Sequence, residues 1–255
     1  MKALVVLFGM NRCAAKTQRS IEENLMAPLR SVVSSHKIIY CLHAPTSVKN
    51  PRTGELVNDN QIYSDLPTEA DALITCRDFG GQIEKKLTCA QKFSDIFDNN
   101  WYSTRALLNQ LQTIETAWRL YPLFCGDEFD FFVFARPDLL YLDQFPFADL
   151  APALLGDANV VALPVWHSYG GFNDRFAVAS RLGAQAYATR GSILEESCRI
   201  RGGLHSESLL RHALTRSNTK VLGLPVRASR VRLTGRVEDE DFSRAVISLP
   251  QVGST

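Results

Sequence analysis

The sequence lacks both an excess of charge of one sign and a long apolar run. Its 255 residues contain 28 Lys and Arg against 27 Asp and Glu, so we expect no bulk attraction to nucleic acid or to an anionic membrane. No apolar run approaches the ~20 residues of a transmembrane helix. The apolar start at residues 3–8 is interrupted by Gly9 and Arg12; it predicts a first buried strand rather than a secretory signal. We therefore expect a cytoplasmic protein.

Several catalytic and metal-binding motifs are also missing. The six cysteines form no Cys-x-x-Cys pair, which argues against a zinc site or a thioredoxin-like motif and favours reduced, mostly buried thiols. The chain has no Gly-x-x-x-x-Gly-Lys-Ser/Thr loop, no Gly-x-Gly-x-x-Gly after the first strand, no Gly-x-Ser-x-Gly elbow and no His-Glu-x-x-His pair. These absences count against phosphate-loop kinases, nicotinamide dehydrogenases, α/β-hydrolases and zinc proteases.

What is present is an alternation of apolar runs and helical patterns, which predicts an α/β fold with a mixed, mostly parallel central sheet flanked by helices. The expected strands are 3–8, 37–43, 72–75, 129–135, 159–163, 175–179 and 220–224, and the expected helices begin near Ser20, Arg105, Ser180 and Ser206. Ser20, Ser180 and Ser206 are expected to cap their helices. Beyond residue 225 the chain turns basic and then acidic. We expect one domain over residues 1–225 and a peripheral C-terminal tail over 226–255.

The most informative segment is the run at 129–135, which stays apolar or aromatic at six of seven positions and then ends on Arg136 and Asp138. Such a run predicts a core strand covered on both faces. In an open α/β sheet, ligands bind at the carboxyl ends of the strands. A glycine-rich segment at 169–176 follows. Together the two segments predict a site for a charged, hydroxyl-rich substrate.

Four short segments carry a resemblance to a known family. They are Phe8-Gly-Met-Asn-Arg12, Phe134-Ala-Arg-Pro-Asp-Leu-Leu140, Gly170-Gly-Phe-Asn-Asp-Arg-Phe176 and His205-Ser-Glu-Ser-Leu-Leu210. In order and spacing they resemble a branch of the GT-A fold glycosyltransferases found among uncharacterised bacterial, viral and plant proteins, over roughly residues 3–215. The resemblance implies a GT-A-like (Rossmann-like) fold. It also implies transfer of a sugar from a nucleotide-sugar donor to the hydroxyl group of a glycan or glycolipid acceptor, in surface polysaccharide or glycoconjugate synthesis. A lipid-linked acceptor would place the protein at the membrane periphery.

The resemblance also implies a divalent cation, Mn²⁺ or Mg²⁺, held by an Asp-x-Asp motif. Here the first acidic position is Arg136, so Asp138 remains as the expected metal ligand, and His205 is a second candidate. Metal dependence is therefore left open. The alternative for Asp138 is a structural one, as the cap of the turn after Pro137.

Substrate contacts are expected from residues that the same motifs place at the strand ends. Gly9 permits close backbone approach, Arg12 suits a phosphate or a ribose, and Arg136 suits a phosphate or a salt bridge to Asp138 or Asp174. In the glycine-rich segment, Gly170, Gly171 and Asn173 are expected near the sugar. His167, between Trp166 and Tyr169, is expected near the acceptor. For each of these residues a turn or packing role is the alternative.

Two carboxylates are candidates for the general base that takes a proton from the acceptor hydroxyl. Asp174 is the first and Glu207 the second. Their structural alternatives are a turn before the next strand for Asp174 and a favourable helix-dipole position for Glu207. Two other functions stay open: a non-catalytic nucleotide- or glycan-binding protein of the same fold, and an unrelated α/β protein that uses a different phosphorylated donor.

Overall fold

A computed structural model describes residues 1–45, 47–49, 54–58, 66, 68–76, 80–126 and 128–250. Its centre is a seven-stranded sheet in the order β10-β8-β9-β6-β1-β2-β5. The strands are β1 (Lys2–Gly9), β2 (Ser35–His43), β5 (Ala72–Cys76), β6 (Phe131–Ala135), β8 (Val160–Pro164), β9 (Ala177–Ala179) and β10 (Lys220–Leu224). Only β9 runs antiparallel to its neighbours, β6 and β8. The predicted class, a mixed and mostly parallel α/β sheet, is confirmed.

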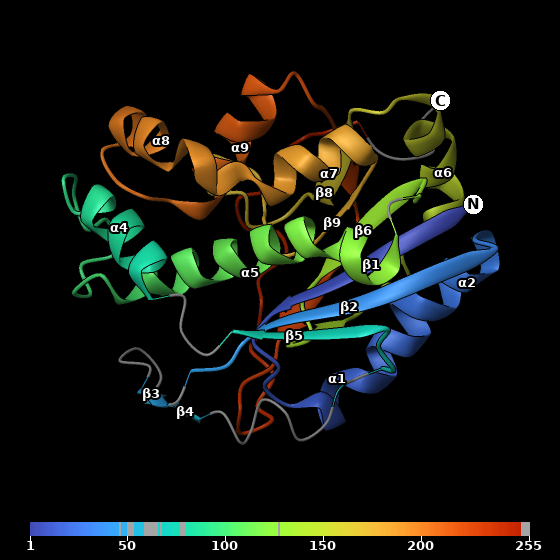
Figure 1. The fold of residues 1–255 in the computed structure, drawn as a ribbon, viewed down its shortest axis with the longest axis horizontal. Coiled ribbons are helices and arrows are strands. Elements are labelled where there is room, and N and C mark those ends of the chain that lie inside the picture. Colours follow the sequence, from blue (N-terminus) through green and yellow to red (C-terminus); the bar gives the residue numbers. More distant parts are fainter. Residues whose placement is uncertain are drawn as a thin grey trace.

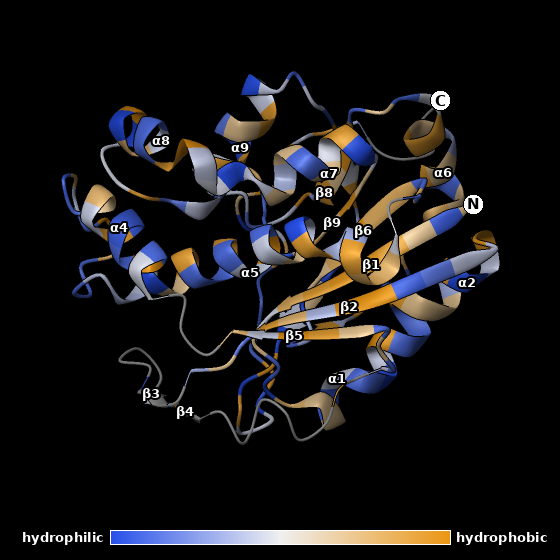
Figure 2. Ribbon diagram, viewed as in Figure 1, coloured by the Kyte–Doolittle hydropathy of each residue, from blue (hydrophilic) through white to orange (hydrophobic). Residues whose placement is uncertain are grey.

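Helices cover both faces of this sheet (Figure 1). Alternate residues of β1 face opposite cores: Val5 and Leu7 pack with one group of helices, whereas Leu4, Val6 and Phe8 pack with the other. The first group is α1 (Ala14–Ile21), η1 (Glu22–Met26), α2 (Ala27–Val32) and α6 (Phe147–Gly156); the second is α5 (Tyr102–Cys125), α7 (Arg181–Ala188) and α9 (Ser206–Arg216). Figure 2 shows the central strands mostly in the colours of apolar residues.

A third apolar cluster lies beyond the sheet, where α4 (Gly81–Ala90) and α8 (Leu194–Arg201) pack against α5 and α9. The short η2 (Arg190–Ile193) connects α7 to α8. A two-stranded pair, β3 (Ser47–Lys49) with β4 (Leu56–Asn58), stands apart from the central sheet. Among the described residues, no helix combines the length and the apolar character needed to cross a bilayer.

Two of the three predicted helix caps, Ser20 and Ser206, are wrong, whereas Ser180 is the N-cap residue of α7 but makes no side-chain capping bond. Ser20 lies inside α1, where its hydroxyl donates to the carbonyl of Thr17 at 2.9 Å. The helix continues past Pro28 because the π-helical turn η1 precedes it and the proline occupies the first turn of α2. Ser180 occupies the predicted N-cap position of α7, but its hydroxyl accepts from the Val160 backbone N–H at 2.8 Å. Ser206 is the first residue of α9 rather than its cap, and its hydroxyl is directed to Asp174.

The segment after residue 225 packs against the rest of the chain. Its strand β11 (Ala228–Arg230) pairs antiparallel with β7 (Leu139–Tyr141). Further along, Phe242 contacts Trp166 edge to face, with ring centroids 5.1 Å apart. In Figure 1 the orange-to-red segment passes the end of the sheet where β1 and β5 finish. The domain boundary at residue 225 stays a prediction, but these residues reach the candidate site.

Candidate functional site

One edge of the sheet collects the predicted site residues. The parallel strands β1 and β6 end there at Gly9 and Ala135, and Arg136 and Asp138 follow directly. Because β9 runs the opposite way, the residues before its first residue lie at the same edge. The chain therefore brings Asp174, from before β9, to the carboxyl ends of β1 and β6. The sheet topology thus unites two motifs that lie far apart in the sequence.

The Asp138 carboxylate is fully buried and paired with two guanidinium groups. Nε of Arg136 donates to Oδ1 at 2.8 Å and its Nη2 donates to Oδ2 at 2.7 Å, a two-pronged contact. Nη1 of Arg12 lies 3.3 Å from Oδ2. Burial alone would raise the pKa of Asp138, but the charges of Arg136 and Arg12 outweigh it and hold that pKa at about 2. Asp138 is therefore ionised, with both oxygens already bonded.

These contacts bear on the divalent cation that the resemblance implies. A metal at Asp138 would share the carboxylate with two guanidinium groups that already contact both of its oxygens. His205 has its contacts elsewhere, with Nδ1 3.3 Å from Oε2 of Glu207 and its ring stacked against Phe97. In the part of the chain that the structure describes, no three His, Cys, Asp or Glu side chains gather around a common point. The described residues thus do not fit a divalent cation.

Gln110 of α5 connects Arg136 to Asp174. Its Oε1 accepts from Nη1 of Arg136 at 3.0 Å, and its Nε2 donates to Oδ2 of Asp174 at 2.8 Å. The same Oδ2 accepts from the Ser206 hydroxyl and faces Nη2 of Arg190 at 3.4 Å. A continuous polar network therefore runs from the end of β6 to the start of α9. Asp174 is the point in it where α5, η2 and α9 meet.

The carboxyl group of Glu207 has a pKa further from its ordinary value than that of Asp138. Burial, and then the nearby charge of Asp174, raise the pKa of Glu207 to about 8. The positive charges of Arg175 and Arg230 oppose this shift, because each of them lowers the pKa of Glu207. Burial lowers the pKa of His205, so the imidazole beside Glu207 is neutral near pH 7. A carboxyl group that titrates near neutral pH suits a general base.

The glycine-rich segment is shaped to pack against the first turn of α9. A Cβ on Gly171 would lie 2.0 Å from the backbone oxygen of Glu207, and the Phe172 N–H donates to that oxygen at 3.0 Å. Gly170 has φ +81° and Tyr169 has φ 43°, in the left-handed region that disfavours a side chain. Gly171 is therefore required for close backbone packing that positions Glu207. A sugar contact by either glycine stays a prediction.

Asn173 and His167 are engaged by protein groups. The Asn173 amide donates to the Trp166 carbonyl at 2.6 Å and accepts from the Arg175 backbone N–H at 3.0 Å. His167 Nε2 lies 3.0 Å from the Asp241 carbonyl oxygen, and its Nδ1 lies 3.3 Å from Oε2 of Glu240. These contacts match the turn and anchoring alternatives. Gly9 differs, because it has φ +96° and open space where a Cβ would stand.

Arg230 of β11 is the residue that sequence reasoning missed most clearly. Its side chain is part-buried, and within the described ranges it has no ion pair and its buried Nε has no hydrogen-bond partner. Burial, followed by the charges of Arg175 and Arg136, lowers the pKa of Arg230 to about 9. Arg230 and Arg232 alternate along an extended segment, so their side chains share a face. The Arg-x-Arg spacing of these two residues is the sequence signal that could have indicated a cluster of positive charge here.

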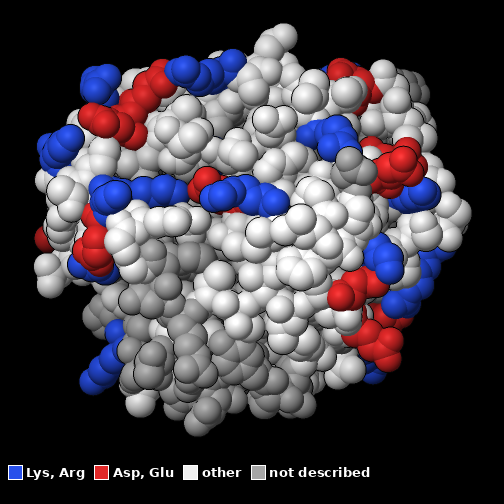
Figure 3. Space-filling view, in the orientation of Figure 1, with Lys and Arg blue, Asp and Glu red and all other residues white. Residues whose placement is uncertain are grey.

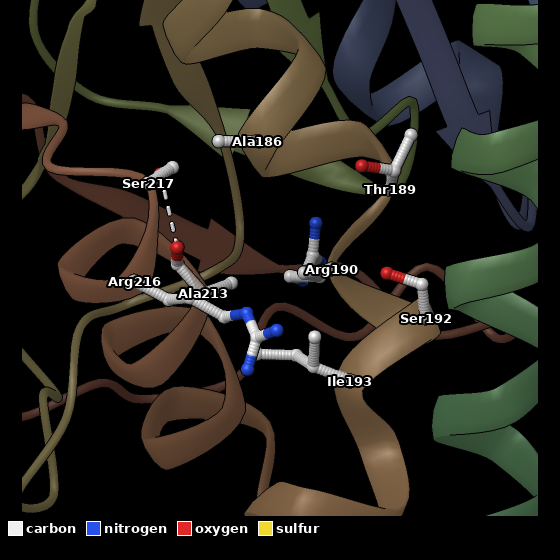
Figure 4. Close-up of a pocket in the computed structure, with 8 residues that line it drawn as sticks. All are labelled: Ala186, Thr189, Arg190, Ser192, Ile193, Ala213, Arg216 and Ser217. Carbon is white, nitrogen blue, oxygen red and sulfur yellow. Dashed lines mark hydrogen bonds between the residues drawn. The ribbon is translucent and has the colours of Figure 1, made fainter.

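The charge pattern of one face and a pocket outside the candidate site do not indicate a second functional site. On the face shown in Figure 3, Lys and Arg intermingle with Asp and Glu rather than forming a region of one sign. A shallow pocket lies between α7, η2 and α9, and Figure 4 shows the eight residues that line it: Ala186, Thr189, Arg190, Ser192, Ile193, Ala213, Arg216 and Ser217. None of them is a predicted site residue. The Arg190 guanidinium connects this pocket to the site, because it also faces Asp174 at 3.4 Å.

Comparison with known proteins adds two structural likenesses. No protein-family model and no curated protein matches the sequence. Mouse xyloside xylosyltransferase 1 is similar with 14% identity and a TM-score of 0.38, over 87% of this chain and 84% of that one. The galactosyltransferase LgtC, with donor and acceptor sugar analogues, is similar with 11% identity and a TM-score of 0.40, over 88% and 73%. At these TM-scores the likeness does not assign a function.

Proposed function

We propose that this protein is a glycosyltransferase that moves a sugar from a nucleotide-sugar donor to an acceptor hydroxyl group. The observation that carries the proposal is the meeting of two kinds of group at one sheet edge. Arg12, Arg136 and Arg230 supply positive charge there, and Glu207 supplies a carboxyl group whose pKa is about 8. Phosphate recognition and proton removal are the two tasks of this reaction.

In the proposed step the bond between the sugar C1 and the β-phosphate oxygen breaks, and its electron pair stays on that oxygen. The acceptor oxygen forms the new bond to C1. Its proton passes to the ionised carboxylate of Glu207, which must therefore be deprotonated before the step. Asp174 holds the start of α9 through Ser206 and contributes the negative charge that raises the pKa of Glu207. We assign the base role to Glu207 and a positioning role to Asp174.

A second candidate is a nucleotide- or glycan-binding protein of this fold that does not turn its ligand over. The pairing of Asp138 with two arginines favours it, because a carboxylate expected at a metal instead stabilises the site internally. The cytoplasmic or membrane-peripheral location and the role in surface polysaccharide synthesis stay predictions of the sequence.

The test is a panel of nucleotide sugars with uridine, guanosine, thymidine and cytidine carriers, with release of the free nucleotide as the readout. Wild-type protein should bind one carrier class and release its nucleotide. Glu207→Gln should keep the binding and lose turnover by about 10²–10⁴-fold, the usual contribution of a general base. Binding by wild type without turnover across many acceptors would favour the second candidate. If no nucleotide sugar binds, the glycosyltransferase proposal and the nucleotide-binding form of the second candidate both fail.

A further inference from the structure

We propose that Arg12, Arg136 and Arg230 together take the place of a divalent cation and bind the diphosphate of the nucleotide donor directly. The inference rests on the proposed function and names the chemistry of its donor site. Its starting point is the disagreement described above: the resemblance implies a metal, but the described residues do not fit one. The same edge of the sheet holds guanidinium groups from three separate parts of the chain.

These three arginines converge because three elements meet. Arg12 comes from the connection between β1 and α1, Arg136 follows β6, and Arg230 ends β11. The Val231 N–H donates to the Asp138 backbone oxygen at 2.9 Å, which fixes β11 beside the turn that carries Arg136. The Arg136 backbone N–H donates to the Tyr141 hydroxyl at 3.0 Å. Tyr141 belongs to β7, the strand that pairs with β11, so this contact fixes the turn relative to β11. The guanidinium groups are therefore held before any ligand arrives.

The cluster of Arg12, Arg136 and Arg230 contains buried N–H groups that make no hydrogen bond within the described ranges. Nε of Arg12 and Nε of Arg230 are buried, and neither has a hydrogen-bond partner among the residues that the structure describes. Nη1 of Arg12 has only its ion-pair contact with Asp138 at 3.3 Å and makes no hydrogen bond there. Buried N–H groups of native proteins are nearly always satisfied by protein, water or ligand. Phosphate oxygens are strong acceptors whose geometry matches the planar guanidinium fork. The unused donors thus point to an anion with several oxygens.

The charge balance points the same way. Within the described ranges, Asp138 is the carboxylate paired with Arg12 and Arg136, and Arg230 has no ion pair. Neighbouring arginines are already neutralised: Arg175 by Glu240 at 2.9 Å, and Arg232 by Glu238 at 3.1 Å. Three guanidinium groups against one carboxylate leave an excess of two positive charges. A diphosphate diester carries two negative charges, so the match is close.

The same groups would act in the transfer step. As the C1–O bond breaks, the β-phosphate oxygen gains one negative charge, and donors fixed in advance stabilise that charge without reorganising. Asp138 is then a positioning residue, because it orients the forks of Arg136 and Arg12 rather than touching the donor. A metal at this place would compete with the arginines for the same oxygens.

The experiment measures binding of uridine, guanosine, thymidine and cytidine diphosphate by calorimetry, on full-length protein freed of metal with excess EDTA. We expect one nucleotide to bind in EDTA with an affinity within about threefold of that in Mn²⁺ or Mg²⁺, a difference too small to indicate a bridging ion. Arg230→Ala should weaken that binding by at least about tenfold, whereas Arg230→Lys, which keeps the charge without the fork, should lose less. Inorganic pyrophosphate should compete with the nucleotide.

The matched control is Arg199→Ala on α8, because Arg199 is exposed and pairs with Glu195 instead. It should leave the affinity unchanged. Binding that appears only with Mn²⁺ or Mg²⁺ would overturn the arginine proposal and leave the glycosyltransferase proposal standing. Equal affinity of wild type and Arg230→Ala would also overturn it. Absence of binding under every condition would instead remove the proposed function. If Arg230→Ala does not fold, the metal-free measurement on wild type and the Arg230→Lys variant decide.

Discussion

Glu207 shows how burial of one side chain links activity to stability. Its pKa is raised to about 8, so ionisation of the assigned base should control the rate. We expect kcat/KM to rise with pH up to about 8 and then level off. The Asp174→Asn variant removes the second cause of the raised pKa, so the midpoint of its profile should move to lower pH. A wild-type profile that is flat between pH 6 and about 9 would contradict the base assignment.

The same residue should shape the dependence of stability on pH. A group with a pKa raised in the folded state contributes stability below its unfolded pKa and loses that contribution as pH rises through the folded value. Urea unfolding should therefore show wild type losing stability from near the ordinary glutamate pKa of ~4.3 up to about pH 8. Glu207→Gln should lack this loss. The exposed Glu128→Gln variant is the control and should follow wild type.

At single positions, the sequence indicated where chemistry would occur but not what each side chain would contact. Arg136 and Asp138 follow the carboxyl end of β6, the strand that the apolar run predicted. The two-pronged contact between Arg136 and Asp138 was one of the predicted alternatives, and it is the one observed. The role of Gln110 could not be predicted, because its position opposite Asp174 depends on how α5 lies across the sheet.

At the scale of elements, Asp138 joins three of them: the connection after β1, the turn after β6, and β11. Replacing Asp138 with Asn would leave two buried guanidinium groups without a counter-charge. We expect a loss of about 3–5 kcal/mol in the free energy of unfolding, measured with urea. Asp239→Asn, an exposed change in the C-terminal segment, should have little effect. An Asp138→Asn variant as stable as wild type would show that the pair does not stabilise the joint.

Elements with strong apolar patterns were predicted well, and those set by tertiary contacts were not. The strands predicted at 3–8 and 129–135 correspond to β1 and to β6, which begins after Asp130, because uninterrupted apolar residues fit the buried centre of a sheet. The direction of β9 was not predicted, since three buried residues carry no information about polarity. Ser180 and Ser206 make no side-chain capping bond, because their hydroxyls bond to groups distant in sequence.

For the whole molecule, the largest surprise is how much the C-terminal segment supplies to the site. Its composition predicted a peripheral tail, and composition cannot show that Arg230 lies beside Asp138 or that Glu240 pairs with Arg175. Trp166 anchors the segment twice: its Nε1 donates to the Val226 carbonyl at 2.8 Å, and its ring meets Phe242. The proposed donor site would therefore be complete only when this segment is docked.

Phe242 offers a test of that dependence, since it is far from Arg230 in sequence and contacts Trp166 rather than the arginine cluster. Phe242→Ala should loosen the segment and speed trypsin cleavage after Arg236 and Arg244, because truncating a part-buried aromatic ring removes apolar contact worth about 1–3 kcal/mol. Nucleoside diphosphate affinity should fall together with this protection, although no arginine has been changed. Phe124→Ala, in the last turn of α5 with a side chain 55% exposed, should alter neither. Faster cleavage with unchanged affinity would mean that the cluster forms without the docked segment.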